Sequence, residues 1–100
     1  MIYLICYDIE EDKKRKKISD RLIADGLERI QYSVFMGVLN KSLLESLKIW
    51  LKSKIAEPKS ENDSVIILQL FPQQIQKMLI LGEKEVDKME LSGQKNTLFL

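Results

Sequence analysis

The chain has 100 residues, with no histidine and only one cysteine, Cys6. These absences exclude zinc fingers, Cys–His nucleophiles and Ser–His–Asp triads. An enzyme built on this sequence therefore has to use carboxylates, hydroxyls, cations and a hard metal ion bound through oxygen. Cys6 stands between Ile5 and Tyr7, where we expect a small, inert and buried thiol.

Long apolar runs are also missing. No apolar stretch approaches a length of about 20 residues, which a helix needs to span a bilayer. The charged segment 10–17 follows directly after the apolar start of the chain, so we expect no signal peptide, no membrane association and a cytoplasmic location. The net charge of +1 says little about partners, since the distribution of charge matters more than its sum. The length predicts one domain over residues 1–100.

Two local patterns begin the chain. Residues 1–9 are apolar, β-branched and aromatic apart from Asp8, which predicts a buried strand. Glu11 or Asp12 is expected to open a helix that runs to about Asp25 and ends at Gly26. The expected buried stripe of this helix consists of Ile18, Leu22 and Ile23.

Residues 27–39 alternate with a period of two, which is typical of strands. Such a segment is long for one strand, so a tight hairpin near residues 32–33 or a bulge at Gly37 is expected to divide it. The apolar even-numbered positions are predicted to face the helices. They are Ile30, Tyr32, Val34, Met36 and Val38.

The second half of the chain predicts another helix and further strands. Ser42 and Glu45 form a capping box for a helix to about Ile55, and its apolar stripe is Leu43, Leu44, Leu47, Trp50, Leu51 and Ile55. A buried strand is expected over residues 64–71 and a short one over residues 77–82. This order predicts an α+β, ferredoxin-like βαββαβ sandwich, an antiparallel sheet with two helices on one face. A second copy of the chain is the simplest cover for the other face.

Two charged residues stand out against this predicted fold. Asp8 lies near the end of the first strand, where a carboxylate must be paired, hydrogen-bonded or metal-bound if it is buried; the alternatives are a surface position or the N-cap of the next helix. Arg15 falls on the same helix face as Ile18 and Leu22. It therefore either meets an anionic partner or extends past the helix end to water.

The motifs together resemble the CRISPR-associated protein two family, the small subunit of the spacer-acquisition machinery. The similarity rests on Tyr7-Asp8-Ile9 at the end of the first strand, on Arg15, and on the segment from Arg29 to Phe35. It covers about the first 40 residues by motif and the rest by strand order. Residues 96–100 also resemble the family's last strand, which adds to the sheet of the partner subunit.

The resemblance implies a homodimer in which residues 83–100 take part in dimer exchange and the two Asp8 carboxylates face each other. It implies a metal-dependent endonuclease, acting on RNA and possibly DNA in CRISPR adaptation and antiviral defence. The residues that it assigns to catalysis are Tyr7, Asp8, Arg15, Arg29 and Phe35. Two departures from the family pattern are Met36, where an acid is common, and Lys17, where a second arginine is common.

The expected chemistry depends on Mg²⁺ bound by Asp8 of both subunits, because one carboxylate per chain is too little for a good site. Arginines hold phosphates better than lysines in a partly desolvated groove. Tyr7 and Phe35 either stack on a base or pack in the protein. The expected nucleic-acid-binding residues are Lys13, Lys14, Arg15, Lys17 and Arg29, part of a basic ridge that also includes Lys16.

Two other functions remain open at this point. One is a non-catalytic dimer that binds duplex DNA by its backbone and bridges the CRISPR integrase. The other is a ferredoxin-like regulatory module for a small ligand, which the lack of a glycine-rich phosphate loop disfavours.

Overall fold

A computed structural model describes residues 1–82 of the chain. The expected partner-pairing strand at residues 96–100, and the whole segment 83–100, lie outside these described residues. The elements are β1 (Ile2–Asp8), α1 (Asp12–Ala24), β2 (Glu28–Gln31), β3 (Val34–Val38), α2 (Lys41–Ala56), β4 (Ser64–Leu70) and α3 (Pro72–Gln76). None of the helices in residues 1–82 is long and apolar enough to cross a membrane.

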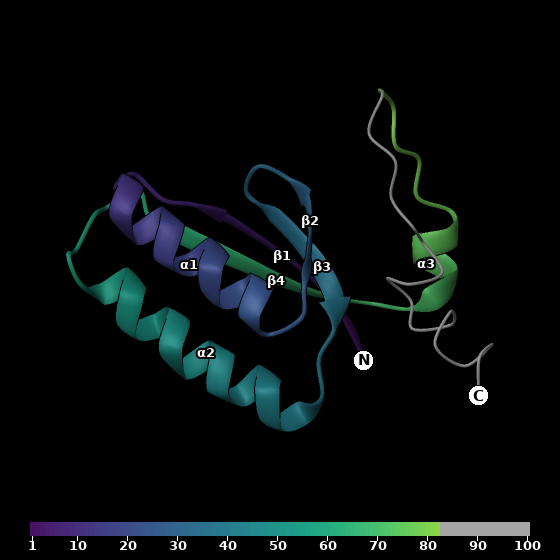
Figure 1. Cartoon of the computed structure of the whole chain (residues 1–100), viewed down its shortest axis with the longest axis horizontal. Coiled ribbons are helices and arrows are strands. Elements are labelled where there is room, and N and C mark those ends of the chain that lie inside the picture. The colour runs from purple at the N-terminus through teal and green to yellow at the C-terminus, as the bar shows by residue number, and fades with distance from the viewer. Residues whose placement is uncertain (83–100) are drawn as a thin grey trace.

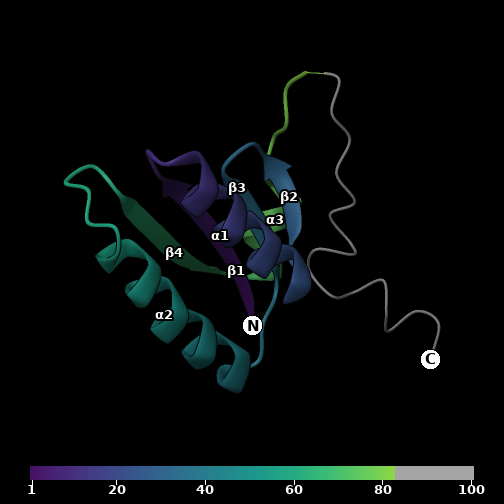
Figure 2. The same ribbon diagram turned by 60° about the vertical axis from the view of Figure 1, so that its left-hand side comes forward.

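The strands form one antiparallel sheet in the order β2-β3-β1-β4. Helices α1 and α2 lie side by side on one face of this sheet, as the two views in Figure 1 and Figure 2 show. This arrangement confirms the predicted ferredoxin-like βαββαβ sandwich.

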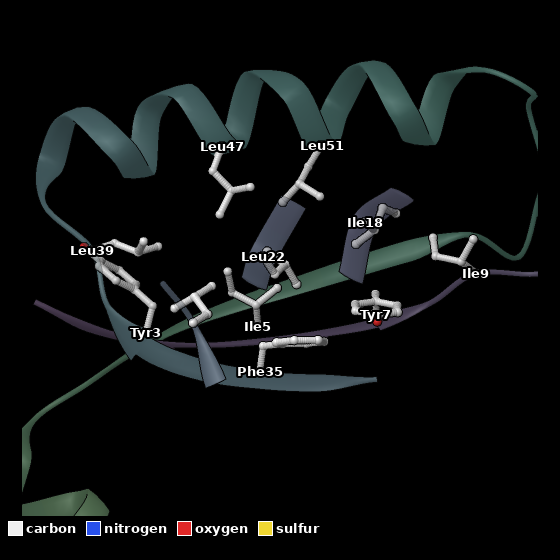
Figure 3. Close-up of a cluster of buried hydrophobic side chains, with 11 residues drawn as sticks. Tyr3, Ile5, Tyr7, Ile9, Ile18, Leu22, Phe35, Leu39, Leu47 and Leu51 are labelled. Carbon is white, nitrogen blue, oxygen red and sulfur yellow. The ribbon is translucent and has the colours of Figure 1, made fainter. Parts of the chain in front are cut away.

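The main core lies between the sheet and these two helices (Figure 3). Tyr3, Ile5 and Tyr7 of β1 point toward the helices, and alternation along the strand places Leu4, Cys6 and Asp8 on the opposite face. The buried members of the core are Tyr3, Ile5, Tyr7, Ile9, Ile18, Leu22, Leu27, Phe35, Leu39, Leu47 and Leu51.

Two expectations about single side chains were wrong. Ile23, assigned to the buried stripe of α1, is 54% exposed, because it stands one residue beyond the buried Leu22 and is turned away from the sheet. Cys6 is only partly buried, because α1 and α2 cover the other face of β1.

The segment 27–39 divides at residues 32–33, as one of the two alternatives predicted. The expectation that its even-numbered positions face the helices was wrong. Phe35 points into the core beneath the helices, while Ile30 and Met36 pack on the opposite face. The cause is the hairpin, whose β2–β3 register shifts between Arg29 and Gln31. Tyr32 lies in the turn and is 68% exposed. One alternation cannot continue through such a turn.

The predicted start of α2 also needs correction. Asn40, and not Ser42, is the N-cap, because its side chain accepts a hydrogen bond from the Leu43 backbone N–H at 2.8 Å. Leu47 and Leu51 of the expected stripe are buried, whereas Leu43 is 38% exposed. Asparagine is as good an N-cap as serine, so the apolar pattern alone could not fix the first residue of the helix.

The expected strand over residues 77–82 is absent from the described chain. Instead Pro72 opens the short helix α3, a position in which its missing N–H costs nothing, and Gln74 accepts a hydrogen bond from the Phe71 backbone N–H at 2.7 Å. Ile75 of α3 covers part of the second sheet face. It belongs to a smaller buried cluster of Ile2, Ile30, Met36 and Ile75.

Candidate functional site

Asp8 is the last residue of β1 and lies opposite Ser64 of β4. Its side chain is exposed, and alternation along β1 from Tyr7, which points toward the helices, places it on the sheet face that α1 and α2 leave uncovered. The carboxylate has neither a hydrogen bond nor an ion pair with any residue of the described range 1–82. Of the alternatives, the surface position is therefore the one observed, and the N-cap of α1 is Glu11.

Arg15 points back along α1 to the chain that follows β1. Its Nε donates to the Ile9 carbonyl at 3.1 Å, and one terminal nitrogen donates to the Glu10 carbonyl at 3.0 Å. The other terminal nitrogen forms an ion pair with Asp12 at 2.8 Å and donates to the Tyr32 hydroxyl at 3.3 Å. Arg15 thus has an anionic partner, and each of its guanidinium nitrogens already binds a group of the protein.

Lys14, expected to bind nucleic acid as part of the basic ridge, is instead buried with 3% of its surface exposed. Its Nζ forms an ion pair with Asp63 at 2.7 Å and donates to the Pro58 carbonyl. The loop between α2 and β4 folds over this part of α1, a contact between residues 49 positions apart. No local pattern could reveal that contact, and Lys14 is unsuited to bind a phosphate in this structure.

Asp63 is a residue that the sequence analysis missed. Besides Lys14, it accepts a hydrogen bond from the Glu10 backbone N–H at 3.0 Å. The hydrogen bond from Lys14 and then that from Glu10 lower the pKa of the Asp63 carboxyl below its ordinary value of 3.8. Its place in a polar loop directly before a strand resembles an ordinary surface position, so the sequence carries no signal for this role.

A second group of site residues lines a hollow of 480 Å³ beside α1 and the β2–β3 turn. Tyr7, Arg15, Arg29 and Tyr32 are among the residues around it. The Arg29 guanidinium lies 5.1 Å from the centre of the Phe35 ring and 5.9 Å from that of Tyr32, both within cation–π range. Tyr32, one of the apolar positions expected to face the helices, was not recognised as a candidate site residue.

The two aromatic residues of the predicted site have different surroundings. Burial raises the pKa of the Tyr7 phenol above its ordinary value of 10.0, and the nearby Arg29 opposes part of that rise. Tyr7 is therefore a neutral phenol near pH 7. Phe35 is fully buried and stacks on Tyr7 with the ring centres 6.2 Å apart. For Phe35 the structure agrees with the packing alternative, because no face of its ring is open to a base.

The structure thus brings Tyr7, Arg15 and Arg29 together and separates them from the Asp8 side chain. Both groups nevertheless lie at one end of the sheet, where the Tyr7 backbone N–H donates to the Ser33 carbonyl at 3.1 Å. Lys13 and Lys17 are exposed on α1. Within residues 1–82 there is no cluster of three or more carboxylate, cysteine or histidine residues able to hold a metal.

Comparison with known proteins matches residues 1–78 to the family model described as CRISPR associated protein Cas2. A relative from Synechocystis sp., named CRISPR-associated endoribonuclease Cas2 3, is 39% identical over 87 residues, which cover 87% of this chain and 90% of that protein. CRISPR-associated endoribonuclease Cas2 2 of Pyrobaculum aerophilum is 52% identical over 52 residues, 52% of this chain and only 57% of that protein.

Solved structures show the same fold. The Streptococcus pyogenes Cas2 structure superposes with a TM-score of 0.70 at 22% identity, covering 82% of this chain and 100% of that one. The hypothetical protein TT1823 from Thermus thermophilus gives a TM-score of 0.69 at 28% identity, covering 85% of this chain and 94% of that one. From the match over residues 1–78 and the relatives that share most of its length, the chain belongs to the Cas2 family of CRISPR-associated proteins.

Proposed function

We propose that this chain is a CRISPR-associated, metal-dependent endonuclease that cleaves RNA, and possibly DNA, as a homodimer in CRISPR adaptation and antiviral defence. Membership of the Cas2 family and the endoribonuclease names of its relatives support nuclease activity. The observation that carries the proposal is the Asp8 carboxylate, exposed at a strand end without a partner among the described residues. Such a group is available to bind a metal ion.

The uncovered sheet face supports the homodimer. Apolar side chains remain exposed on it, since Ile66 is 61%, Leu68 is 52% and Val38 is 48% exposed. Exposed apolar side chains on one face favour association, and a twofold symmetric contact is the commonest arrangement. Because Asp8 lies on the same face, a dimer that packs these faces together with its twofold axis near the end of β1 would bring the two Asp8 residues toward each other.

The exposed Asp8 carboxylate is the type of ligand that Mg²⁺ prefers, since this ion binds through one or two carboxylates and keeps several waters. We propose that Asp8 of each subunit contributes one carboxylate. When bound, the ion would lower the pKa of a water and neutralise charge developing on the phosphoryl oxygens. Two facing carboxylates without a cation would repel each other and raise the pKa of one of them, so the paired arrangement itself favours a cation.

Nucleic acid is proposed to approach from the end of the sheet at which Asp8 and the hollow both lie. Arg29 has no ion-pair partner in the described part of the chain, so its guanidinium can bind a phosphate with two parallel hydrogen bonds. The exposed ring of Tyr32 beside it offers a stacking surface for a base. Lys13 and Lys17 extend the positive surface along α1. Tyr7 interacts with Arg29 as a neutral phenol and helps to orient its guanidinium.

A nuclease assay on single- and double-stranded RNA and DNA, with Mg²⁺ or with EDTA, tests this function. Asp8→Asn keeps the size of the side chain but removes its charge. We expect the variant to lose Mg²⁺-dependent cleavage while it keeps the dimer and the affinity for nucleic acid. Glu45→Gln is the control, because it neutralises an exposed carboxylate of α2 whose partner is Lys48; it should cleave at the wild-type rate.

Cleavage by Asp8→Asn at the wild-type rate would contradict the proposal. The alternative would then be the better one, a non-catalytic dimer that binds duplex DNA and bridges the CRISPR integrase. A pull-down of the integrase with the wild-type protein and with Asp8→Asn would test that role, which does not require the carboxylate.

A further inference from the structure

The chain directly after Asp8 is held by hydrogen bonds from two separate parts of the molecule. Arg15 of α1 binds the Ile9 carbonyl at 3.1 Å and the Glu10 carbonyl at 3.0 Å. Asp63, which directly precedes β4, accepts the Glu10 backbone N–H at 3.0 Å. The Ile9 carbonyl, the Glu10 carbonyl and the Glu10 N–H are therefore each bound by a charged side chain.

Asp63 is itself held in place by burial and by Lys14. The Lys14 and Asp63 side chains are only 2% and 1% exposed, with 2.7 Å between Nζ and Oδ2. Such an ion pair needs additional hydrogen bonds to offset desolvation, and the Pro58 carbonyl and the Glu10 N–H supply them. The Ser60 hydroxyl also donates to the Glu10 carboxylate at 2.6 Å. The loop between α2 and β4 is thereby joined to the end of β1.

This arrangement matters because Asp8 is exposed at a strand end, where local opening is easiest. Metal binding between two subunits requires each carboxylate to be held within about 0.5 Å of its working position. The Asp8 carboxylate makes no contact of its own in the described chain that would restrain it. Its position therefore depends on the backbone on either side. Before it, the Tyr7 N–H donates to the Ser33 carbonyl, and Asp8 itself pairs with Ser64 of β4. After it, Arg15 and Asp63 bind the backbone of residues 9 and 10.

We infer that Lys14, Arg15 and Asp63 are positioning residues that fix the Asp8 carboxylate for metal binding, and that Arg15 does not serve as a phosphate ligand. The inference rests on the proposed nuclease function of Asp8. It assigns a role to two buried residues that bind no substrate. It also predicts that lysine cannot replace the arginine at position 15, since the planar guanidinium spans two carbonyls whereas a lysine ammonium reaches them as a single point charge.

Two variants test the inference, with Glu45→Gln as a control. Asp63→Asn removes the charge that holds Lys14 and weakens the contact to Glu10. Arg15→Lys keeps the charge but loses the two-carbonyl geometry. The control removes the carboxylate of an exposed ion pair with Lys48 on α2. Each protein is compared with wild type for kcat, KM, the Mg²⁺ concentration at half-maximal rate, and hydrogen exchange of the Glu10 amide without nucleic acid.

We expect both variants to lower kcat about tenfold or more and to raise the half-maximal Mg²⁺ concentration, as is typical when a group that orients a metal ligand is lost. KM for the nucleic acid should stay within about twofold, because no phosphate contact is removed. Exchange of the Glu10 amide, whose N–H is bound by Asp63, should rise in both variants and stay unchanged in Glu45→Gln.

Other outcomes overturn the inference. A higher KM with unchanged kcat in Arg15→Lys would make Arg15 a phosphate ligand. A loss of kcat that only follows the folded fraction would make Lys14 and Asp63 merely structural. If Asp63→Asn does not fold, Arg15→Lys still provides the test. If the wild-type protein does not cleave at all, the nuclease proposal fails, whereas Mn²⁺ binding at Asp8 and amide exchange still decide whether these residues position the carboxylate.

Discussion

Asp63 accepts hydrogen bonds from the Nζ of Lys14 and from the Glu10 backbone N–H, and both lower the pKa of its carboxyl in the folded state. A group whose pKa is lowered by folding stabilises the fold above its unfolded pKa and loses that effect as the pH falls through the folded pKa. The contribution of Asp63 is therefore complete at neutral pH. It disappears as the pH falls below the ordinary value of 3.8.

Asp63→Asn should accordingly destabilise the protein at pH 7 and have a smaller effect near pH 3. Urea denaturation between these two pH values measures the difference. The wild-type midpoint should fall more steeply with acid than that of the variant. Glu45→Gln, in which an exposed ion pair is removed, should follow the wild-type pH profile. Parallel profiles for wild type and Asp63→Asn would mean that the buried pair does not contribute through its charge.

At the scale of the elements, β3 packs closely against the chain that enters β2. A Cβ atom on Gly37 would lie 2.8 Å from Leu27 Cδ2 and 3.3 Å from Leu27 Cα. Leu27 is buried in the main core and has little room to move. Gly37 is thus required by close packing inside β3, where it pairs with Tyr3, and it does not form the bulge that the sequence allowed as an alternative.

Gly37→Ala should reduce the free energy of unfolding by about 1–3 kcal/mol, the usual effect of overpacking a core. Urea denaturation of Gly37→Ala, Leu27→Ala and the double variant tests this explanation. Leu27→Ala removes the Cδ2 atom, so the double variant should lose less stability than the sum of the single effects. Strict additivity would show that the loss has another origin.

Helix α1 carries the positive surface proposed for nucleic acid, but with fewer free lysines than its sequence indicates. Lys14 is buried with Asp63, and Lys16 pairs with Asp20 at 2.7 Å. Lys13 and Lys17 remain exposed, with no ion-pair partner in the described chain. We therefore assign the phosphate contacts of α1 to these two residues.

Replacing Lys13 and Lys17 together by glutamine should weaken binding to all sequences alike. It should also reduce the slope of log affinity against log salt concentration by about 1 for each lysine lost. Fluorescence anisotropy with a labelled duplex at several salt concentrations provides the measurement. Lys52→Gln on the exposed side of α2 is the control and should leave the slope unchanged. An unchanged slope in the double variant would place the binding surface elsewhere.

At the scale of the whole molecule, two exposed isoleucines allow the proposed dimer interface to be compared with an ordinary surface. Ile66 is 61% exposed on the uncovered sheet face, and Ile49 is 71% exposed on α2. Ile66→Lys introduces a charge where two sheet faces are proposed to meet, so it should yield monomers and abolish cleavage. Ile49→Lys should remain a dimer. Sedimentation velocity at matched concentrations measures both, and a dimeric, active Ile66→Lys would contradict this interface.

The sequence by itself determined most of the fold. Helix and strand periodicities depend on residues a few positions apart, and so do turn and breaker residues such as Gly26 and Pro72. For this reason β1, α1, α2 and β4 were predicted nearly in place, and their order predicted the βαββαβ sandwich. The combination of Tyr7, Asp8, Arg15 and Arg29 with that order also led to the family, and Asp8 was singled out as a carboxylate in an apolar strand.

Tertiary structure decided the properties that depend on contacts between distant segments. The β2–β3 hairpin turned Phe35 into the core, against the alternation of the segment. The loop before β4 buried Lys14 against Asp63, 49 residues away, and converted a supposed surface cation into part of the support for Asp8. Burial and ion pairing depend on which segments meet in the folded chain, and a pattern along one element contains no information about the segment that will cover it.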